Sequence, residues 1–447
     1  MVQAVILAGG KGTRLASRLN GKPKPLVDVD GVPLLKRQID NLMANGVDDI
    51  VLLVNHAANQ IEAFIAEQNF ACAVTLIDDG DPRGTAGAAL ACLDRLQDRF
   101  VVVYGDTLFD VDITHMIDIH IKSGAHGTLL LHPNDHPHDS DLVEISEEGW
   151  ITAFHSYPHN PGWYLRNLVN AALYVIDKKC LTGWVDRIPV GDFAKDLFPA
   201  MLTEGALLQG YVSFEYIKDV GTPTRLDKAE GHLRRGVVER ARRRYPQKAV
   251  FLDRDGTLNQ LTDYVRKPDD LVLFEDAGAA VHRLNDAEYR VVVVTNQPVL
   301  ARGECDVAGL AQIHAKLESE LGDAGAFLDA IYYCPHHPHK GYAGEVPELK
   351  IDCACRKPGM LMIEQAVTAL NIDLARSWMV GDSTADIAMA GKAGIRSVLV
   401  RTGEGGRDGK WPAAPDFTAG SLAEAVDIIL ANQQSAGTLA ISETIQQ

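Results

Sequence analysis

Two stretches of the sequence decide the fold, namely Val2-Gln3-Ala4-Val5-Ile6-Leu7-Ala8-Gly9-Gly10-Lys11-Gly12-Thr13-Arg14 and Ala249-Val250-Phe251-Leu252-Asp253-Arg254-Asp255-Gly256-Thr257. Each is a short apolar run that ends in a loop of glycine and charged residues, which is typical of a buried strand followed by a functional loop. Further apolar runs follow both of them and alternate with stretches of helical periodicity. This alternation predicts an α/β fold, and its restart at Ala249 predicts two Rossmann-like domains.

The apolar runs give the positions of the expected elements. In the first half we expect helices over 34–45 and 85–96 and strands at 2–8, 50–55, 73–77 and 100–105. In the second half we expect strands at 249–253, 291–295, 378–382 and 397–400. Each of these strands is followed by a loop or a helix, as in sheets that are mostly parallel.

A basic stretch marks the boundary between the halves. Residues 224–244 have a helical pattern that is rich in arginine, and Pro246 ends it. The stretch could be an anion-binding patch, but runs of charge are usually solvated faces, so we interpret it as a solvated connecting helix. The sequence thus predicts a first domain over 1–235, a basic linker over 236–246, a second domain over 247–432 and a flexible tail over 433–447.

The composition narrows the class of protein. The chain has 447 residues, of which 46% are hydrophobic and 23% charged, and its net charge is −17. This acidic balance argues against a binder of nucleic acid or of membrane surfaces, because both require a basic footprint. No apolar stretch approaches the ~20 residues that span a bilayer. The start lacks an export signal, so we expect a cytoplasmic protein with its seven cysteines reduced. The sequence leaves open whether the chain forms a homo-oligomer.

The loop after the first strand, Gly9-Gly10-Lys11-Gly12, has the composition of a phosphate-binding turn. Glycines let backbone N–H groups approach a phosphate, and a following helix N-terminus favours its negative charge. Alone, the loop could equally be a structural turn, since it matches neither the Walker nor the dinucleotide pattern. Lys22-Pro23-Lys24-Pro25 follows closely and holds two cations on a segment stiffened by proline. Such a segment suits the stabilisation of charge on a transferring phosphoryl or nucleotidyl group.

Read together over residues 1–235, these motifs resemble the sugar-phosphate nucleotidyltransferases. The resemblance implies a glycosyltransferase-A-like mixed sheet, and attack by a sugar 1-phosphate on the α-phosphorus of a nucleoside triphosphate. It implies that Arg14 steadies the departing pyrophosphate and Lys24 the α-phosphate, which makes both candidate catalytic residues. The implied nucleotide-binding residues are Leu7, Ala8, Gly9, Gly10, Gly12, Thr13, Arg14, Lys24, Gly84 and Thr85.

Further positions extend this resemblance. Asp106 and Asp219 match the two carboxylates that hold magnesium in the family, and such hard oxygen ligands suit Mg²⁺. Asn170 matches a residue on the sugar side. His155 stands where many relatives carry a lysine that grips the sugar phosphate, so this chain departs from the family pattern there. Within the family, the short opening and Asn55-His56 most resemble the heptose 1-phosphate guanylyltransferases.

The second opening places two carboxylates, Asp253 and Asp255, directly after an apolar strand. One carboxylate can attack phosphorus while the other handles the proton of the leaving group, although an isolated D-x-D is more often a turn. Three further motifs follow in order along the chain, and they are Thr295-Asn296, Arg356-Lys357-Pro358 and Gly381-Asp382-Ser383-Thr384-Ala385-Asp386. Over residues 246–432 this set resembles the haloacid dehalogenase phosphatases, which implies a parallel sheet like theirs.

That second resemblance implies a role for each motif. Asp253 would form an aspartyl-phosphate, and Asp255 would protonate the departing alkoxide and then activate water. Thr295 and Lys357 would hold the phosphoryl oxygens. Asp253, Asp382 and the main-chain carbonyl of Asp255 would bind Mg²⁺, which offsets the repulsion between carboxylate and phosphate. The candidate substrate-binding residues of this half are Asn259, Thr295, Asn296, Arg356, Lys357 and Ser383.

Cys334, His336, Cys353 and Cys355 form a C-x-H and a C-x-C pair just before Arg356. Three thiolates and an imidazole are a closed tetrahedral zinc set, so we predict a structural Zn²⁺ that pins a long loop beside the phosphate site. Three free thiols are the alternative, and neighbouring histidines could replace His336 as the ligand. A zinc loop in such a phosphatase resembles the D-glycero-D-manno-heptose 1,7-bisphosphate 7-phosphatases and also the histidinol-phosphate phosphatases.

The two halves make chemical sense as consecutive steps. Removal of the 7-phosphate from a heptose 1,7-bisphosphate leaves heptose 1-phosphate, which is the nucleophile that the first half requires. The sequence therefore predicts a bifunctional enzyme that makes a nucleotide-activated heptose, with GDP as the expected nucleotide, for surface polysaccharide such as lipopolysaccharide. The alternatives are the same chemistries on a hexose or amino sugar phosphate, a histidinol-phosphate type of phosphatase half, and a regulatory protein that only binds sugar nucleotides.

Overall fold

The computed structural model describes residues 2–78 and 80–444, and side chains as far as residue 433. The chain divides into two compact units that do not follow the sequence strictly. Unit 1 comprises Met1–His132, Ser140–His159 and Leu168–Arg243, as far as these residues are described. Unit 2 likewise comprises Pro133–Asp139, Asn160–Asn167 and Arg244–Gln447.

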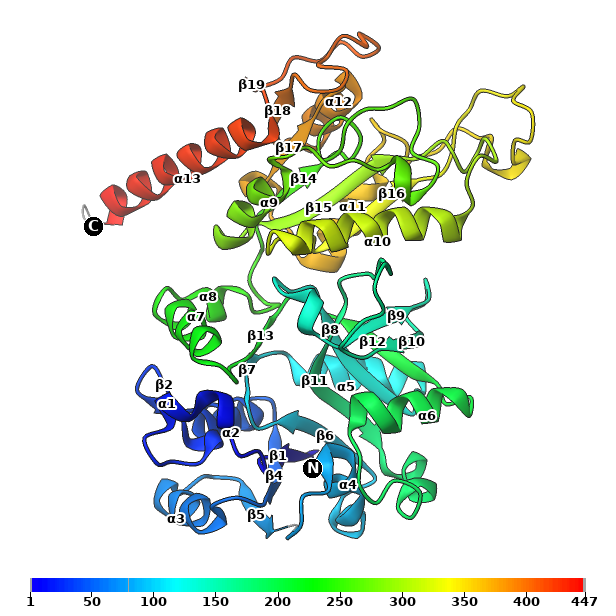
Figure 1. Cartoon of the computed structure of the whole chain (residues 1–447). Coiled ribbons are helices and arrows are strands. Elements are labelled where there is room, and N and C mark those ends of the chain that lie inside the picture. Colours follow the sequence, from blue (N-terminus) through cyan, green and yellow to red (C-terminus); the bar gives the residue numbers. More distant parts are fainter. Residues whose placement is uncertain (1, 79, 445–447) are drawn as a thin grey trace. The chain divides into compact units, whose positions relative to one another are not determined.

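The sheet of unit 1 is mixed. Its centre is β1 (Val2–Leu7), which pairs in parallel with β4 (Val47–Val54) and with β6 (Arg99–Tyr104). Beyond β6 the chain turns antiparallel in β11 (Val169–Asp177). The other strands of the sheet, among the described residues, are β5 (Ala73–Asp78), β8 (Gly127–His132), β9 (Leu142–Ile145), β10 (Ile151–His155) and β12 (Leu208–Val212). The prediction of a mixed sheet in the first half is therefore confirmed (Figure 1).

Both faces of this sheet are covered, which explains why its central strands are apolar throughout. Val5 and Val102 point to one face, where they pack against α4 (Gly84–Ala91) and α6 (Phe198–Thr203). Ile6 and Val103, the next residues along, point to the other face. There they meet α2 (Leu34–Ala44), α3 (Ala58–Gln68) and α5 (Ile113–Ser123). Each fully buried side chain of this kind contributes roughly 1.5–3 kcal/mol to stability.

The carboxyl ends of β1 and β6 meet at one edge of the sheet. Ala8 and the glycine loop follow β1, and Gly105 and Asp106 follow β6. A second, two-stranded sheet then pairs β7 (Thr107–Asp110) with β13 (Tyr216–Asp219), which brings Asp219 to the same edge. The helix expected over 85–96 ends at Ala91 and is followed by a separate 3-10 turn, Leu93–Arg95.

The basic stretch is not one solvated helix. Gly236 has a φ of 70° and separates α7 (Pro223–Arg234) from α8 (Val237–Arg240). Arg234 lies 2.7 Å from Asp30, and Arg242 lies 2.8 Å from Asp110. The apolar side of α7 is buried in a small core of unit 1. The arginines are largely exposed, as expected of a solvated face, but the stretch forms two helices and not one, and carboxylates of unit 1 pair with Arg234 and Arg242.

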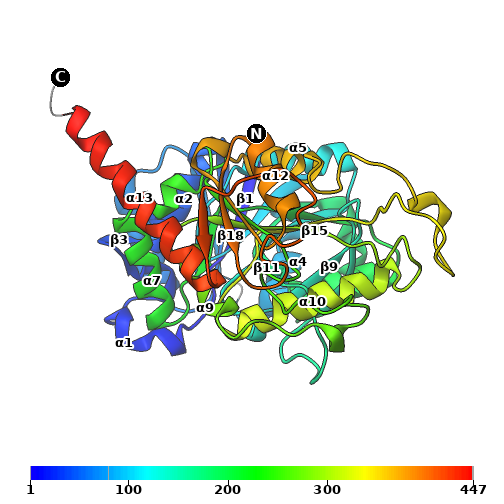
Figure 2. The ribbon, with the colours of Figure 1, turned by 90° about the horizontal axis from the view of Figure 1, so that it is seen from above.

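The sheet of unit 2 is entirely parallel, as predicted. Its described strands, in spatial order, are β16 (Ala330–Cys334), β15 (Arg290–Asn296), β14 (Ala249–Leu252), β17 (Trp378–Gly381), β18 (Arg396–Val400) and β19 (Phe417–Ala419). On one face of this sheet lie α9 (Ala277–Asp286), α10 (Val307–Asp323) and α13 (Leu422–Thr444), which contact one another or the strands. On the other lie α11 (Leu361–Leu370) and α12 (Thr384–Ala393), and Figure 2 shows α9 and α10 opposite α12.

The final helix, α13, runs through most of the segment for which the sequence predicts a flexible tail. Its first turns carry the buried residues Leu422, Val426 and Ile429 at helical spacing, so packing starts the helix before the polar segment begins. Residues 445–447 of that tail lie outside the described part of the chain. No helix among the described residues is long and apolar enough to cross a membrane.

Candidate active sites in the two units

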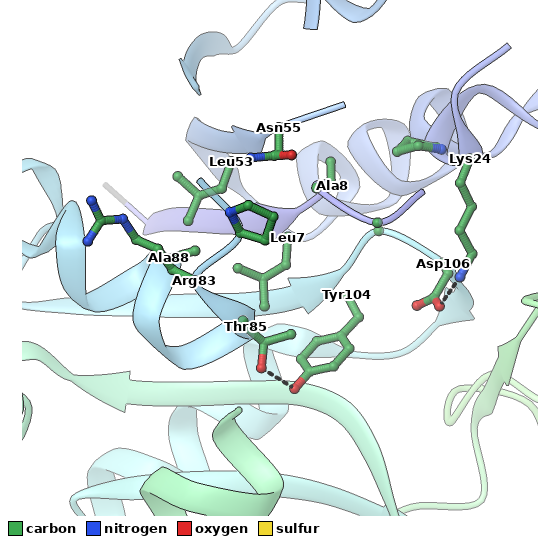
Figure 3. Close-up of a pocket in the computed structure, with 16 residues that line it drawn as sticks. Leu7, Ala8, Lys24, Leu53, Asn55, Arg83, Thr85, Ala88, Tyr104 and Asp106 are labelled. Atoms are coloured by element: carbon green, nitrogen blue, oxygen red, sulfur yellow. Dashed lines mark hydrogen bonds and ion pairs between the residues drawn. The ribbon is translucent and has the colours of Figure 1, made fainter. Parts of the chain in front are cut away.

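A pocket of about 270 Å³ opens at the strand ends of unit 1 (Figure 3). It is lined by Leu7, Ala8, Gly9, Gly10, Lys24, Pro25, Leu53, Asn55, Pro82, Arg83, Gly84, Thr85, Ala88, Tyr104, Gly105 and Asp106. Lys24 and Asp106 lie at one end of this lining, and Arg83 lies at the other (Figure 3). The pocket therefore has a charged end next to the glycine loop and a longer, largely apolar wall, which suits a nucleotide.

Two glycines shape the charged end of this pocket. Gly12 has a φ of 65°, and a Cβ added to it would lie 2.9 Å from the Cβ of Lys24. Gly105 passes so close to β1 that an added Cβ would lie 2.8 Å from the carbonyl oxygen of Leu7. A side chain at Gly12 would displace the segment that carries Lys24, and one at Gly105 would push the end of β6 away from β1. Gly12 is thus needed for the position of Lys24, and Gly105 for the close approach of the two strand ends.

The predicted charged residues of unit 1 gather around Gly221. Lys24 Nζ lies 2.5 Å from Asp106 Oδ2, and the backbone N–H of Val220 donates to the carbonyl of Asp106 at 2.9 Å. A Cβ added to Gly221 would lie 3.4 Å from both Arg14 Nη2 and Lys24 Nζ, and 2.7 Å from Asp219 Oδ1. The structure therefore brings together two cations and two carboxylates that are far apart in the sequence.

Several predicted nucleotide contacts do not line the pocket itself. Among the described residues, its lining includes neither Gly12, Thr13 nor Arg14. Thr85 does line it, but the Thr85 hydroxyl donates to Asp192 at 2.6 Å and accepts from the phenol of Tyr104 at 3.1 Å. These hydrogen bonds fix the start of α4. The side chain of Thr85 therefore has a structural role in addition to its predicted contact with a nucleotide.

Asn170 lies on β11 at an irregular point of the strand, away from the pocket lining. Ala172 has a φ of 56°, a strained value for a residue with a side chain, and its N–H donates to Asn170 Oδ1 at 3.3 Å. His155, at the position where relatives carry a lysine, lies with Nε2 2.9 Å from Glu144 Oε1. The sugar-side contacts of Asn170 therefore stay a prediction.

Unit 2 holds a cluster of buried acids at the carboxyl ends of β14 and β17. Carboxylate oxygens of Asp253, Asp382 and Asp386 lie within 4.8 Å of one another. Lys357 Nζ is 2.7 Å from Asp253 and 2.7 Å from Asp386. The backbone of Glu404 donates to Asp382 at 2.6 Å, and glycines at positions 256 and 403 leave no room for a side chain beside that carboxylate.

The charges of this cluster perturb one another strongly. Burial, together with the neighbouring carboxylates, raises the pKa of Asp253 to about 7 and that of Asp382 to about 8. Although burial disfavours its charge, Asp253 and Asp386 raise the pKa of Lys357 above its ordinary value. One cation among three buried carboxylates leaves an excess of negative charge. A divalent cation with hard oxygen preference fits this donor set, and Asp253 and Asp382 would hold it. The carboxylate of Asp386 also bonds Lys357 and Ser383, and the predicted role of the Asp255 carbonyl stays a prediction.

Asp255, the second acid of the motif, faces a different set of partners. Its carboxylate accepts from the guanidinium of Arg254 at 2.8 Å, from the amide of Asn259 at 3.0 Å and from that of Gln297 at 2.9 Å. Burial opposes its ionisation, yet these donors lower the pKa of Asp255 overall. The surroundings thus shift the pKa values of Asp253 and Asp255 in opposite directions, although only one residue lies between them in the sequence.

The other predicted residues of unit 2 support this site. The amide of Gln297 donates to Thr295 Oγ1 at 2.9 Å, and Asn296 Oδ1 accepts from the backbone of Lys357 at 3.0 Å. Ser383 Oγ donates to Asp386 at 2.6 Å. Asn259 is fully buried behind Asp255, so its predicted contact with substrate stays a prediction. Gln297 follows the Thr295-Asn296 motif directly, but nothing in the sequence predicts that its amide bonds Asp255.

The four predicted zinc ligands meet at one point. The sulfur of Cys334 lies 3.5 Å from that of Cys353 and 3.1 Å from that of Cys355, and His336 Nδ1 lies 3.2 Å from Cys355 Sγ. Burial raises the pKa values of the Cys334 and Cys355 thiols. Three thiols and one imidazole nitrogen at such distances fit a tetrahedral metal, and zinc is the metal that this donor set prefers. The guanidinium of Arg356 donates to the carbonyl of His336 at 3.1 Å, which links the cluster to the phosphatase loop.

Comparison with known proteins identifies the first half. A family model described as nucleotidyl transferase matches residues 3–235, just over half of the chain. The chain belongs to this family. The solved structure of HddC from Yersinia pseudotuberculosis is 26% identical, with 52% of this chain and 100% of that chain covered and a TM-score of 0.46.

Comparison identifies the second half as well. A model described as HAD-hydrolase-like matches residues 354–425. The D-glycero-beta-D-manno-heptose-1,7-bisphosphate 7-phosphatase of Haemophilus ducreyi is 46% identical over 160 residues, which are 35% of this chain and 85% of that protein. A D,D-heptose 1,7-bisphosphate phosphatase from B. bronchiseptica, solved with magnesium and phosphate, is 36% identical and covers 42% of this chain and 99% of its own, with a TM-score of 0.37. The chain is thus a bifunctional enzyme with a nucleotidyltransferase half and a haloacid dehalogenase-like phosphatase half.

Proposed function

We propose that unit 2 removes the 7-phosphate of D-glycero-D-manno-heptose 1,7-bisphosphate and that unit 1 then transfers GMP from GTP to the heptose 1-phosphate. The observation that carries this proposal is the 46% identity to a heptose bisphosphate phosphatase over 85% of that protein's length, joined in one chain to a nucleotidyltransferase. The product of the phosphatase is the nucleophile of the transferase. The choice of GTP rests on the resemblance of the first motifs to the guanylyltransferases.

In unit 2 the buried carboxylate of Asp253 attacks phosphorus, and the bond to the 7-oxygen of the sugar breaks. The negative charge of the bound phosphate favours a protonated Asp255 against the donors that lower its pKa, so that it gives a proton to that oxygen and later takes one from the water that hydrolyses the aspartyl-phosphate. Lys357, 2.7 Å from Asp253, and Thr295 hold the phosphoryl oxygens in both steps. Bound Mg²⁺ would neutralise the negative charge that otherwise keeps a phosphate away from three carboxylates.

In unit 1 the sugar phosphate is itself the nucleophile, so no side chain needs to be one. Lys24 and Arg14 face the same small region and offset the charge that develops on the α-phosphate and on the departing pyrophosphate. Asp106 lies in the turn between β6 and β7, and Asp219 lies at the end of β13, which pairs with β7; the two carboxylates would hold Mg²⁺ together with the substrate phosphates. The apolar wall beyond Leu53 and Tyr104 gives the nucleoside a dry surface.

A pair of matched variants tests the proposal. The purified protein is incubated with heptose 1,7-bisphosphate, Mg²⁺ and each nucleoside triphosphate in turn, while phosphate and pyrophosphate are both measured. Asp253→Asn should abolish phosphate release, yet it should still release pyrophosphate when heptose 1-phosphate is supplied. Asp106→Asn should do the reverse. If the parent releases phosphate faster from hexose bisphosphates than from the heptose, or prefers another nucleotide to GTP, the proposed substrates are wrong.

A further inference from the structure

Arg254 stands between the two acids of the phosphatase motif and contacts both of them. Its backbone N–H donates to Asp253 Oδ1 at 2.7 Å, whereas its guanidinium binds the carboxylate of Asp255. Its side chain is fully buried, which is rare for an arginine. Its carbonyl accepts from the N–H of Leu258 at 2.8 Å and so closes the turn that follows the strand. One residue thus fixes the backbone, the nucleophile and the second acid.

The guanidinium belongs to a cage of donors around Asp255. Arg254 Nη2 lies 2.8 Å from each carboxylate oxygen, and Arg254 Nε lies 3.1 Å from Oδ1. Asn259 donates to Oδ1 at 3.0 Å and Gln297 to Oδ2 at 2.9 Å. The side chain of Asp255 still keeps 26% of its surface exposed. The cage therefore holds this carboxylate from behind and leaves one edge open.

His314, on α10, supports the far side of the guanidinium. Its Nε2 lies 3.4 Å from Arg254 Nη1, and its ring packs against Tyr333 at a centroid distance of 5.9 Å. Burial, aided by the charge of Arg254, keeps His314 in its neutral form, which can accept a hydrogen bond at Nε2. His314 thus accepts from the one guanidinium nitrogen that does not face Asp255.

We propose that Arg254, backed by His314, is a positioning residue that aims Asp255 at the oxygen that leaves phosphorus. The planar fork of an arginine fixes both oxygens of a carboxylate in one plane, which a lysine cannot do. This inference rests on the proposed aspartyl-phosphate chemistry but not on the identity of the sugar. It makes proton transfer by Asp255, and not the attack of Asp253, the step that depends on Arg254.

The proposal predicts that two kinds of phosphate ester depend differently on Arg254. When Asp253 attacks a sugar phosphate, the P–O bond to an alkoxide breaks, and this oxygen must receive the proton of Asp255 as it leaves. When Asp253 attacks p-nitrophenyl phosphate, the departing nitrophenolate is stable and needs no proton. A misaimed Asp255 should therefore slow the first ester and spare the release of nitrophenolate from the second.

The test compares Arg254→Lys, which keeps the charge but loses the fork, with the parent. The first measurement is phosphate release from heptose 1,7-bisphosphate, and the second is the pre-steady-state burst of nitrophenolate. We expect phosphate release to fall by about 30-fold and the burst rate to stay within about threefold of the parent. Asp255→Asn should give the same pattern in stronger form. His314→Leu should give it in weaker form, with phosphate release lowered by about threefold to tenfold.

Lys316→Met is the matched control, because Lys316 is a buried cation on the same helix as His314 that donates to backbone carbonyls and pairs with Glu320, without a contact to Asp253 or Asp255 among the described ones. Any loss in this control should affect both esters equally. An equal loss of both signals in Arg254→Lys and in His314→Leu would show a merely structural role and overturn the proposal. If the parent shows a burst but does not hydrolyse the heptose ester, the proposed substrate fails instead. The comparison is then made with the primary sugar phosphate that the parent hydrolyses.

Discussion

The two active sites handle phosphorus in surroundings that differ sharply in solvation. In unit 2 the side chains of Asp386 and Lys357 are 0% and 3% exposed, and Asp253 is nearly as buried. In unit 1 the side chains of Asp106 and Asp219 are 28% and 35% exposed. The phosphatase site of unit 2 is a cluster of buried charged side chains. The site of unit 1 is an open pocket whose charged side chains remain partly exposed to solvent.

This difference follows from which molecule supplies the nucleophile. In the proposed phosphatase reaction a carboxylate of the protein itself attacks, and burial removes the water that would otherwise stabilise it and weaken every nearby charge. In the transferase reaction two substrates must enter and meet, so the site keeps space and offers cations and glycine N–H groups at its rim. The charged side chains of the unit 2 site therefore pair with one another and contribute to the stability of the fold. Those of the unit 1 site are more exposed and can bind ligands.

We expect the largest difference between the two sites when the central lysine of each, Lys357 or Lys24, is replaced. Lys357→Met should lower phosphate release by at least about 10³-fold and destabilise unit 2 by about 3 kcal/mol without metal, because it leaves buried carboxylates unpaired. Lys24→Met should lower nucleotidyl transfer by about 10²-fold. It should cost less than about 1 kcal/mol, since its partner Asp106 stays in contact with water. Assays of both activities and denaturant titrations measure these effects.

The contrast would be wrong if Lys24→Met destabilised the protein as much as Lys357→Met. Lys36→Met serves as the control for losing a surface pair in unit 1, because Lys36 pairs with Asp40 at 2.9 Å one helical turn away and otherwise lies over the ring of Phe70. We expect this control to change neither activity, and to change stability by only a few tenths of a kcal/mol.

Loss of the predicted zinc site should also affect the two activities differently. Cys355→Ser should free the segment that carries Arg356 and Lys357, so we expect phosphate release to fall by about 10²-fold while nucleotidyl transfer keeps its parent rate. Zinc content by mass spectrometry and both activities are the measurements. Cys72→Ser, in unit 1 and far from any other cysteine in sequence, is the matched control and should keep both activities and the metal. A zinc-free Cys355→Ser variant with full phosphatase activity would contradict the loop-pinning role.

The fold was readable from the sequence because both sheets have apolar strands that end in short polar motifs. The runs at Val2 and Ala249 begin central strands, and the alternation around Val5 and Ile6 fills two opposite faces. What the apolar pattern could not give is that two short segments of the first half, Pro133–Asp139 and Asn160–Asn167, belong to unit 2. These segments lack periodicity, so only tertiary contacts decide where they belong.

The site was readable where a residue belongs to a recognisable motif, and unreadable where a contact joins two elements that share no motif. Lys357 and the zinc ligands stand in local patterns, and the structure brings them together as groups. The pairing of Asp219 with Arg225 at 2.6 Å, and that of Arg254 with His314, join different elements. The Asp253-Arg254-Asp255 triplet places a cation between the two acids in the sequence. No sequence rule shows, however, that its side chain turns inward.

The pH dependence of unit 2 gives a smaller effect. Because burial raises the pKa of Asp253 to about 7 and that of Asp382 to about 8, the folded site binds protons more tightly than the unfolded chain. Without divalent metal, this contribution to the free energy of unfolding is full near pH 4 and is lost as pH rises toward 8. Mg²⁺ competes with those protons, so its stabilising effect should grow over the same range. Thermal unfolding with Mg²⁺ or EDTA at pH 6 and pH 8 measures this, and a larger Mg²⁺ effect at pH 6 would contradict it.

The smallest expected effect tests whether the open site of unit 1 depends on backbone shape. Gly12→Ala forces a side chain onto a φ of 65° and against the Cβ of Lys24, so we expect a loss of about 1–2 kcal/mol and an increase of KM for the nucleoside triphosphate. Gly183→Ala meets nothing within 4 Å at an ordinary φ, and should change neither property. Gly10→Ala also meets no protein atom, yet Gly10 lines the pocket, so it should raise KM without loss of stability. If Gly10→Ala left KM unchanged, the glycine loop would shape the chain but not contact the phosphates. Binding there would then depend on Lys24 and Arg14 alone.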